Sequence, residues 1–147
     1  MQTAAIFVRA AHALALATTA PDGTPQIAPL FYVADEQLRL YWFSKPSAEH
    51  SRNLRLRPAA AVTIFRDTAK WREIRGVQLT GTAAVVRSPQ RRRAMEEAFR
   101  KRFALGPEFD ALLATHRLYC FTPRWLRWID NTQGLGHKTE QTFPLDG

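Results

Sequence analysis

The sequence contains a single cysteine, Cys120, so an internal disulfide and a zinc site made only of thiolates are both excluded. No apolar run approaches the roughly 18–20 residues that a membrane-spanning helix needs. The Ala-rich segment 9–20 loosely mimics a signal peptide, but no basic cluster precedes it and its alternation favours a strand. We therefore expect a cytoplasmic protein with no membrane partner.

Several common motifs are also missing. There is no Walker A loop, no Gly-x-Gly-x-x-Gly after a strand, no Gly-x-Ser-x-Gly turn and no internal repeat. His12, His116 and His137 are scattered without the paired spacing of metal ligands, and we expect them to be structural. No metal site is predicted.

Acidic residues are fewer than basic ones, 13 against 21, and the net charge is +8. This balance favours anionic partners such as nucleic acid, a phosphorylated small molecule or a membrane surface. Much of the excess lies in segment 87–103, where Ser88 and Pro89 predict a helix start. A buried stripe is expected at helical spacing, and the basic residues are left for a solvated face. The stripe is Met95, Ala98, Phe99 and Phe103, and the basic residues are Arg91, Arg92, Arg93, Arg100, Lys101 and Arg102.

The basic helix also suits a module that grips nucleic acid, with Trp125 and Trp128 as base-stacking residues. These tryptophans are three residues apart in a predicted strand, so they project from opposite faces and split the stacking platform. Nucleic acid is therefore not the partner that we expect.

The length of 147 residues fits one domain, residues 1–147. Short strands joined mostly by turns predict an antiparallel barrel or sandwich. Strands are expected at 13–19, 25–34, 38–43, 59–65, 72–86, 117–122 and 124–130, with a turn at Asp22-Gly23, and helices at 3–11, 48–55, after Ser88 and near 107–116. Gly76 and Gly81 predict bulges or close backbone approach in the longest strand.

The turn between the third strand and the next helix combines Ser44, Lys45, Pro46 and Ser47. Pro46 ends the strand and Ser47 is a predicted N-cap. Helical N–H groups, the two hydroxyls and Lys45 would suit a phosphate, with His50 and Arg52 in the first turns. The alternative is a helix that is merely capped and carries a few solvated charges.

The order of these segments resembles the pyridoxamine 5′-phosphate oxidase-like FMN-binding split-barrel proteins. The resemblance is carried by "PQIAPLFYVADEQLRLYWFS", "HSRNLRLRPAAAVTIF" and "IRGVQLTGTAAVV". The tail "WIDNTQGLGHK" is similar to the small YhbP-like branch of that superfamily. The implied fold is mainly β, an antiparallel six- or seven-stranded split barrel with flanking helices.

The resemblance further implies a homodimer with FMN in a cleft at the interface. Two groups of residues are implied to contact the cofactor. Phe43, Ser44, Lys45, Ser47, His50 and Arg52 belong to the phosphate side, and Arg75, Gly76 and Gln78 belong to the strand beside the flavin.

Two positions depart from the family pattern. His50 stands where many members have lysine, and Gly76 stands where the true oxidases often have glutamine. The arginine-rich C-terminal segment for the vitamin substrate is absent, so pyridoxamine phosphate oxidation is not expected. The resemblance implies a flavin-dependent oxidoreductase acting on an unknown small molecule. A cofactor-free stress protein and a haem-binding protein, with His50 or His137 as axial ligand, are the alternatives.

The tail 128–138 contains Gly134 and Gly136, which permit tight turns, while Asp130 and Asn131 favour side-chain bonds to the backbone. One interpretation is a packing tail that covers the open end of the barrel. The other is a tail that closes over the flavin, with Trp128 as an apolar wall and Lys138 as a nearby charge.

Overall fold

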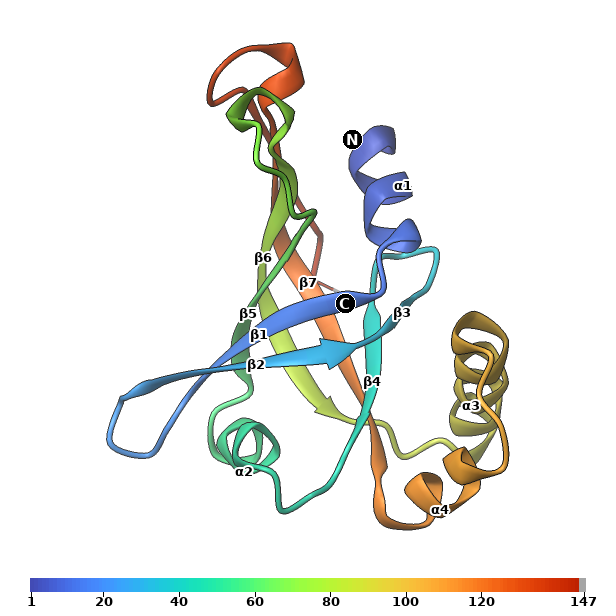
Figure 1. Cartoon of the computed structure of the whole chain (residues 1–147). Helices are drawn as coiled ribbons and strands as arrows, with labels where there is room; N and C mark the ends of the chain where they lie inside the picture. Colours follow the sequence, from blue (N-terminus) through green and yellow to red (C-terminus); the bar gives the residue numbers. More distant parts are fainter. Residues whose placement is uncertain (146–147) are drawn as a thin grey trace.

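The computed structural model describes residues 1–145. Helices are interspersed among the strands along the chain, and Figure 1 shows the strands at the centre with the helices around them. In chain order the elements are α1 (Gln2–Ala10), β1 (Ala13–Thr19), β2 (Pro25–Phe31), β3 (Val33–Ala34), β4 (Leu40–Ser44), α2 (Glu49–Leu56), β5 (Ala59–Phe65), η1 (Trp71–Glu73), β6 (Arg75–Val85), α3 (Pro89–Phe103), α4 (Glu108–Thr115), β7 (Arg117–Asp130), η2 (Asn131–Gln133) and β8 (Lys138–Thr142).

The strands form one antiparallel sheet in the order β2-β1-β5-β6-β7-β4-β3, with β8 added on β7. The sheet curls, so that the β1–β2 hairpin crosses in front of β6 and β7 in Figure 1. The predicted antiparallel split barrel with flanking helices is confirmed. The seven strands of the main path also agree with the prediction, whereas β8 was not foreseen.

Alternation along the strands decides which side chains enter the barrel. In β1, Leu14, Leu16 and Thr18 are buried, whereas the alanines between them face outward. The same period of two fills the interior from the other strands. The helix α1 covers one end of this core, where the Phe7 ring lies 5.2 Å from the Trp128 ring.

Three local features differ from the sequence predictions. The predicted strand 25–34 is interrupted at Tyr32, which is buried and donates a hydrogen bond to the carbonyl of Val8. The strands predicted at 117–122 and 124–130 are one continuous strand, β7, which meets a bulge of β6 at Thr80/Gly81. The predicted N-cap Ser47 is wrong, because α2 is capped at Ala48 and no side chain bonds to its first turn.

The bulge explains one of the two strand glycines. A Cβ on Gly81 would lie 2.1 Å from the carbonyl oxygen of Thr122, so no larger residue fits without a shift of the backbone. The predicted close approach at this position is confirmed.

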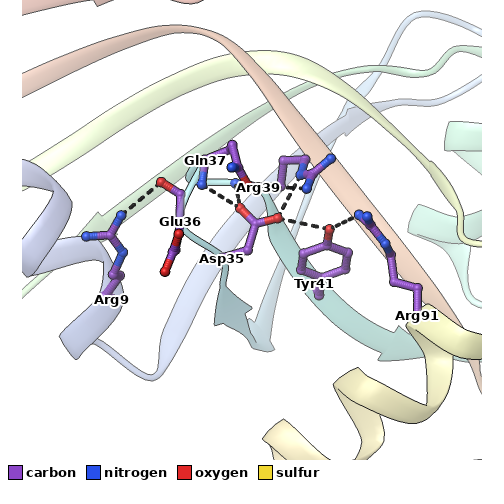
Figure 2. A network of polar contacts seen from close by, with 7 residues as sticks. All are labelled: Arg9, Asp35, Glu36, Gln37, Arg39, Tyr41 and Arg91. Atoms are coloured by element: carbon purple, nitrogen blue, oxygen red, sulfur yellow. Dashed lines mark hydrogen bonds and ion pairs between the residues drawn. The ribbon is translucent and has the colours of Figure 1, made fainter.

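The basic helix α3 starts as predicted, because the Ser88 side chain accepts a hydrogen bond from the Arg91 N–H. Figure 2 shows how this end of the helix is tied to the sheet: Arg91 donates to the Tyr41 hydroxyl at 2.6 Å, and this hydroxyl donates to Asp35 at 3.1 Å. Burial raises the pKa of Tyr41, which keeps its proton available for Asp35.

Other basic residues of α3 are also engaged within the chain. Arg92 binds the carbonyls of Leu113 and His116 and the carboxylate of Glu96. Arg100 pairs with Asp110, and Arg102 donates to the Ala10 carbonyl. The predicted solvent-side basic face is confirmed, since Arg91, Arg93, Lys101 and Arg102 are exposed. The internal contacts of α3 nevertheless leave fewer free cations for nucleic acid.

Candidate functional site

The turn that follows β4 is held by a contact between its two ends. The hydroxyl of Ser44, the buried last residue of β4, lies 2.8 Å from Nε2 of His50 in the first turn of α2. Burial lowers the pKa of His50, against a smaller opposing effect of the nearby Glu49 carboxylate. The imidazole is therefore neutral at pH 7 and exchanges one hydrogen bond with Ser44.

Two arginines of α2 fold back over this turn. Arg52 donates to the Ser47 carbonyl at 2.8 Å, and Arg55 donates to the Pro46 carbonyl at 3.1 Å. Both bonds hold the backbone of the turn in place. Arg52, which was predicted to contact the cofactor, therefore stabilises the conformation of the turn. The side chains of Lys45 and Ser47 remain exposed. They lie near the N–H groups of the first turn of α2, which have no acceptor within the helix.

This arrangement has the donors that an anion requires: an ammonium, a hydroxyl and backbone N–H groups at a positive helix end. One carboxylate disfavours the binding of an anion at this helix end. Glu49 occupies the first position of α2 and places a carboxylate at the same helix end. The donor set therefore fits a phosphate, with a lower affinity than a site without Glu49 would have.

An aromatic cavity of about 540 Å³ lies beside β4, on the side of α3 and α4. Phe43 is central to it, because its ring meets Phe99 edge-on at 5.0 Å and Phe109 at 5.7 Å. Arg92 lies over the Phe43 ring at 5.5 Å and joins α3 to this wall. The aromatic side chains that line the cavity are Phe31, Phe43, Phe99, Phe103 and Phe109. A space of this volume accommodates a planar organic ring system.

The sequence did not reveal this cavity. Phe99 and Phe103 were recognised as a buried stripe and Phe43 as the end of a strand, but their meeting depends on the fold. The one available signal was the concentration of phenylalanine in α3 and α4, which lie beside Phe43 of β4 in space but far from it in sequence.

Gln78 lies elsewhere, on the outer face of the sheet. It lines a hollow of about 380 Å³ together with Ala15, Ala61, Trp125 and Arg127. Arg127 donates to its side-chain oxygen at 3.4 Å. Small residues predominate on this outer face, whereas Ile27, Phe31 and Phe65 expose 66%, 65% and 67% of their surface. Ile27 and Phe65 are thus large apolar side chains that lie mostly in the open, and Phe31 is also mostly exposed although one side of its ring meets Phe103 at 5.2 Å.

Arg75 and Gly76 are distant from residues 44–50, the turn predicted to hold a phosphate and named the phosphate turn below. Ser44 is paired with Arg117 at one end of β7, and Arg75 is paired with Asp130 at the other end. Because β7 has 14 residues at about 3.3 Å each, these ends lie roughly 40 Å apart along the strand. One chain does not bring the two groups of predicted residues together.

Arg75 has a structural partner at this end. Its guanidinium donates to both carboxylate oxygens of the buried Asp130 at 3.3 Å. Burial pushes the pKa of Asp130 upward, but hydrogen bonds from Thr132 and Arg75 outweigh it and hold the pKa below its usual value. The ion pair therefore joins β6 to the end of β7.

Gly76 is required by packing. A Cβ at this position would lie 2.8 Å from the carbonyl oxygen of Ile64 on β5, so a side chain fits only if the strands shift. The close contact between β5 and β6 therefore requires glycine at this position, where the oxidases often have glutamine. It leaves this position without a polar group for a flavin.

The position of Trp128 contradicts the interpretation that this residue forms an apolar wall beside a flavin. It is 5% exposed and packs against Phe7 in the core, so it has no face left to form a wall beside a flavin. Trp125, by contrast, lines the outer hollow. The prediction that the two tryptophans point to opposite faces is confirmed, and with it the argument against a stacking platform.

The tail has the predicted turn chemistry. Asp130 accepts a hydrogen bond from the Thr132 N–H at 3.0 Å, and Asn131 accepts one from the Gly136 N–H at 3.0 Å. Gly134 and Gly136 have φ values of 130° and 72°. Lys138 is exposed in β8, at the end of the molecule remote from the phosphate turn.

Within residues 1–145, no three His, Cys, Asp or Glu side chains gather as a metal site requires. No helix in the same range has both the length and the apolar composition to cross a bilayer.

Comparison with known proteins identifies the family of this chain. The sequence model of the family described as pyridoxamine 5′-phosphate oxidase matches residues 2–129. The chain belongs to this family. No curated protein sequence gives a significant match.

Three solved structures illustrate the similarity of fold. The conserved hypothetical protein Rv2991 of Mycobacterium tuberculosis is 22% identical, with a TM-score of 0.77 over 99% of this chain and 91% of the other. A haem-binding protein of Mycobacterium smegmatis is 20% identical, with a TM-score of 0.69 over 96% and 55%. The haem storage protein HutZ of Vibrio cholerae is 19% identical, with a TM-score of 0.68 over 83% and 88%. At these identities the comparison concerns the fold alone.

Proposed function

We propose that this member of the pyridoxamine 5′-phosphate oxidase family is an FMN-binding flavoprotein. The observation that carries the proposal is the junction at the end of β4. Phe43 forms a wall of the aromatic cavity, and Ser44 and Lys45 follow it directly into the anion-binding turn. A planar ring system that carries a phosphate matches an aromatic wall and a donor-rich turn that follow each other directly along the chain.

In this proposal Lys45, Ser47 and the first N–H groups of α2 hold the phosphate. Ser44 and His50 stabilise the turn, since the hydrogen bond between their side chains joins its two ends. Phe43 and its aromatic neighbours exclude water around the ring. The bound flavin would supply hydride or electron transfer, and the chain would set its position and its electrostatic surroundings.

We further propose that the site is completed in a homodimer. The phosphate turn and the Arg75–Gln78 segment lie at opposite ends of β7, so one cofactor can contact both only if each comes from a different chain. The outer face of the sheet is the surface that suits a second copy. It presents Ile27, Phe31 and Phe65 among alanines and threonines that permit close approach, and it includes Gln78.

The substrate class in this proposal is a small molecule other than pyridoxamine phosphate. The glutamine of the true oxidases is replaced by Gly76, and packing against Ile64 prevents a simple return to it. Assignment to the YhbP-like branch remains a prediction from the tail sequence.

Titration of the purified protein with FMN, followed by flavin fluorescence, tests the proposal. We expect saturable quenching, and Lys45→Ala should weaken the affinity by about tenfold or more because a charge-assisted bond contributes about 1.5–3 kcal/mol. Lys101→Ala is the matched control, since Lys101 is an exposed lysine that does not line the cavity. Equal weakening by both variants would indicate only non-specific attraction.

Haem is the second candidate, favoured by a cavity that is lined only by apolar side chains. Neither predicted axial ligand is well placed for it. Nε2 of His50 is bound to Ser44, and His137 lies in the tail near the far end of β7. A Soret band on addition of haem, together with no response to FMN, would reverse the order of the two candidates.

A further inference from the structure

A second cavity lies at the end of the barrel beside α2, and it is not part of the flavin site proposed above. It has a volume of about 320 Å³ and is enclosed by α2, the ends of β6 and β7, and the loop that leads to α3. Its polar lining residues are Ser51, Arg55, Arg87, Arg117 and Tyr119, and the remaining lining residues are apolar. No carboxylate of residues 1–145 lines it.

The charge of this cavity is unbalanced. Arg55 donates to the Pro46 carbonyl. Arg87 and Arg117 have no hydrogen-bond or ion-pair partner within the described part of the chain, residues 1–145. Three exposed arginines thus line one cavity without a carboxylate of residues 1–145 to balance their charge, which favours an anion as ligand. By contrast, Arg75, Arg92 and Arg100 are paired with carboxylates of the chain.

Ser51 gives independent evidence for a ligand. Its residue is 2% exposed, yet its hydroxyl has no hydrogen-bond partner among residues 1–145. Buried hydroxyl groups are almost always bonded, so this donor lacks an acceptor that the chain does not provide. Ser51 lines the same cavity as the three arginines. Rotation of this hydroxyl toward the cavity would let one anion bind the hydroxyl and the guanidinium groups together.

We propose that this cavity binds the phosphate group of a small phosphorylated ligand. Arginine forks match the paired oxygens of a phosphate, and the three approach from different elements, as a tetrahedral group requires. The apolar lining from Leu54, Pro58 and Val85 leaves space for a small organic group attached to the phosphate. This site is separate from the phosphate turn, because Ser51 and Arg55 open into a cavity that Lys45 and Ser47 do not line.

Isothermal titration calorimetry of the full chain with inorganic phosphate, at constant ionic strength, tests the site. We expect a saturable binding event whose affinity Lys45→Ala, in the separate phosphate turn, leaves unchanged. Arg117→Gln and Arg87→Gln should each weaken binding about tenfold or more. Arg93→Gln removes the same charge from the exposed surface of α3 and should leave the affinity unchanged. If Arg93→Gln weakens binding as much, or if phosphate does not saturate, the proposal is overturned.

Ser51→Ala separates the site from general stability. Removing an unpaired buried hydroxyl should leave the unfolding free energy unchanged or raise it, while phosphate binding becomes weaker. Loss of stability with unchanged phosphate binding would show that the hydroxyl has a structural partner, and would contradict the proposal. Titration with phosphate in the presence of saturating FMN distinguishes the two anion sites. The phosphate affinity should be unchanged, and its loss would show that the cavity takes the phosphate of the flavin instead.

Discussion

The Ser44 hydroxyl and Nε2 of His50 lie 2.8 Å apart and join the end of β4 to the first turn of α2. Because burial lowers the pKa of His50 below its ordinary value of 6.5, the unfolded chain takes up a proton at a higher pH than the folded protein does. The free energy of unfolding should therefore be highest above pH 6.5 with respect to this group, and should fall as the pH is lowered below it. Urea unfolding at a series of pH values measures this slope.

The variant His50→Asn provides the comparison, since asparagine can still bond to Ser44 but does not titrate. The slope between pH 6.5 and pH 5 should be shallower for His50→Asn than for the wild type. Identical slopes would mean that His50 is not kept neutral by the fold.

Trp128 and Trp125 should respond very differently to truncation. Trp128→Ala removes a buried ring that packs on Phe7 and should reduce the unfolding free energy by about 3–5 kcal/mol. Trp125→Ala, on the outer face, should reduce the unfolding free energy of the monomer by a smaller amount. Chemical unfolding compares the two variants, and similar losses would contradict the assignment of Trp128 to the core.

Gly76 should not tolerate a side chain. Gly76→Ala places a Cβ near the Ile64 carbonyl and should destabilise the fold by about 1–3 kcal/mol. Gly106→Ala is a suitable control, because its nearest neighbour is the flexible end of Glu108. Gly76→Gln should also fail to raise the FMN affinity. An increase in affinity without loss of stability would mean that the position is open to a flavin.

Arg92 should hold α4 in place. Its bonds to the Leu113 and His116 carbonyls connect the end of α4 to α3, and α4 supplies Phe109 to the aromatic cavity. Arg92→Leu should increase the amide hydrogen exchange of residues 108–116, whereas Arg93→Leu should not. Unchanged exchange in both variants would leave Arg92 as a surface residue.

The sequence predicted the order of the strands and the main turns because these depend on local signals. The alternation in β1, the Asp22-Gly23 turn and the Ser88-Pro89 helix start each lie within a few residues. The strand β8 gave no such signal. Its residues, KTEQT, are polar and all exposed, so no alternation marks them as a strand.

The candidate site was less accessible from sequence. The turn at 44–50 was found because serine, lysine and proline follow one another, but its fixing by Arg52 and Arg55 depends on how α2 folds back. The aromatic cavity combines β2, β4 and the helices after β6, which are distant in sequence. The position of Trp128 was misjudged because proximity to a glycine-rich tail indicates nothing about which face of the strand is buried.

The outer face of the sheet should form an apolar interface between the two chains of the proposed homodimer. Phe65→Asp places a charge among Ile27, Phe31 and the alanines of β1, and should shift the protein from dimer to monomer. The free chain should keep its fold, because the Phe65 side chain is mostly exposed. Circular dichroism serves as the control for folding.

Sedimentation velocity of the protein with FMN, recorded both at the protein absorbance and at the visible flavin absorbance, tests the central claim most directly. We predict that the flavin signal of the wild type sediments with a dimer, and that Phe65→Asp gives a folded monomer that has lost the flavin signal. A folded wild-type protein that sediments without flavin at high micromolar FMN, or a Phe65→Asp monomer that retains it, would contradict a flavin site completed between two chains.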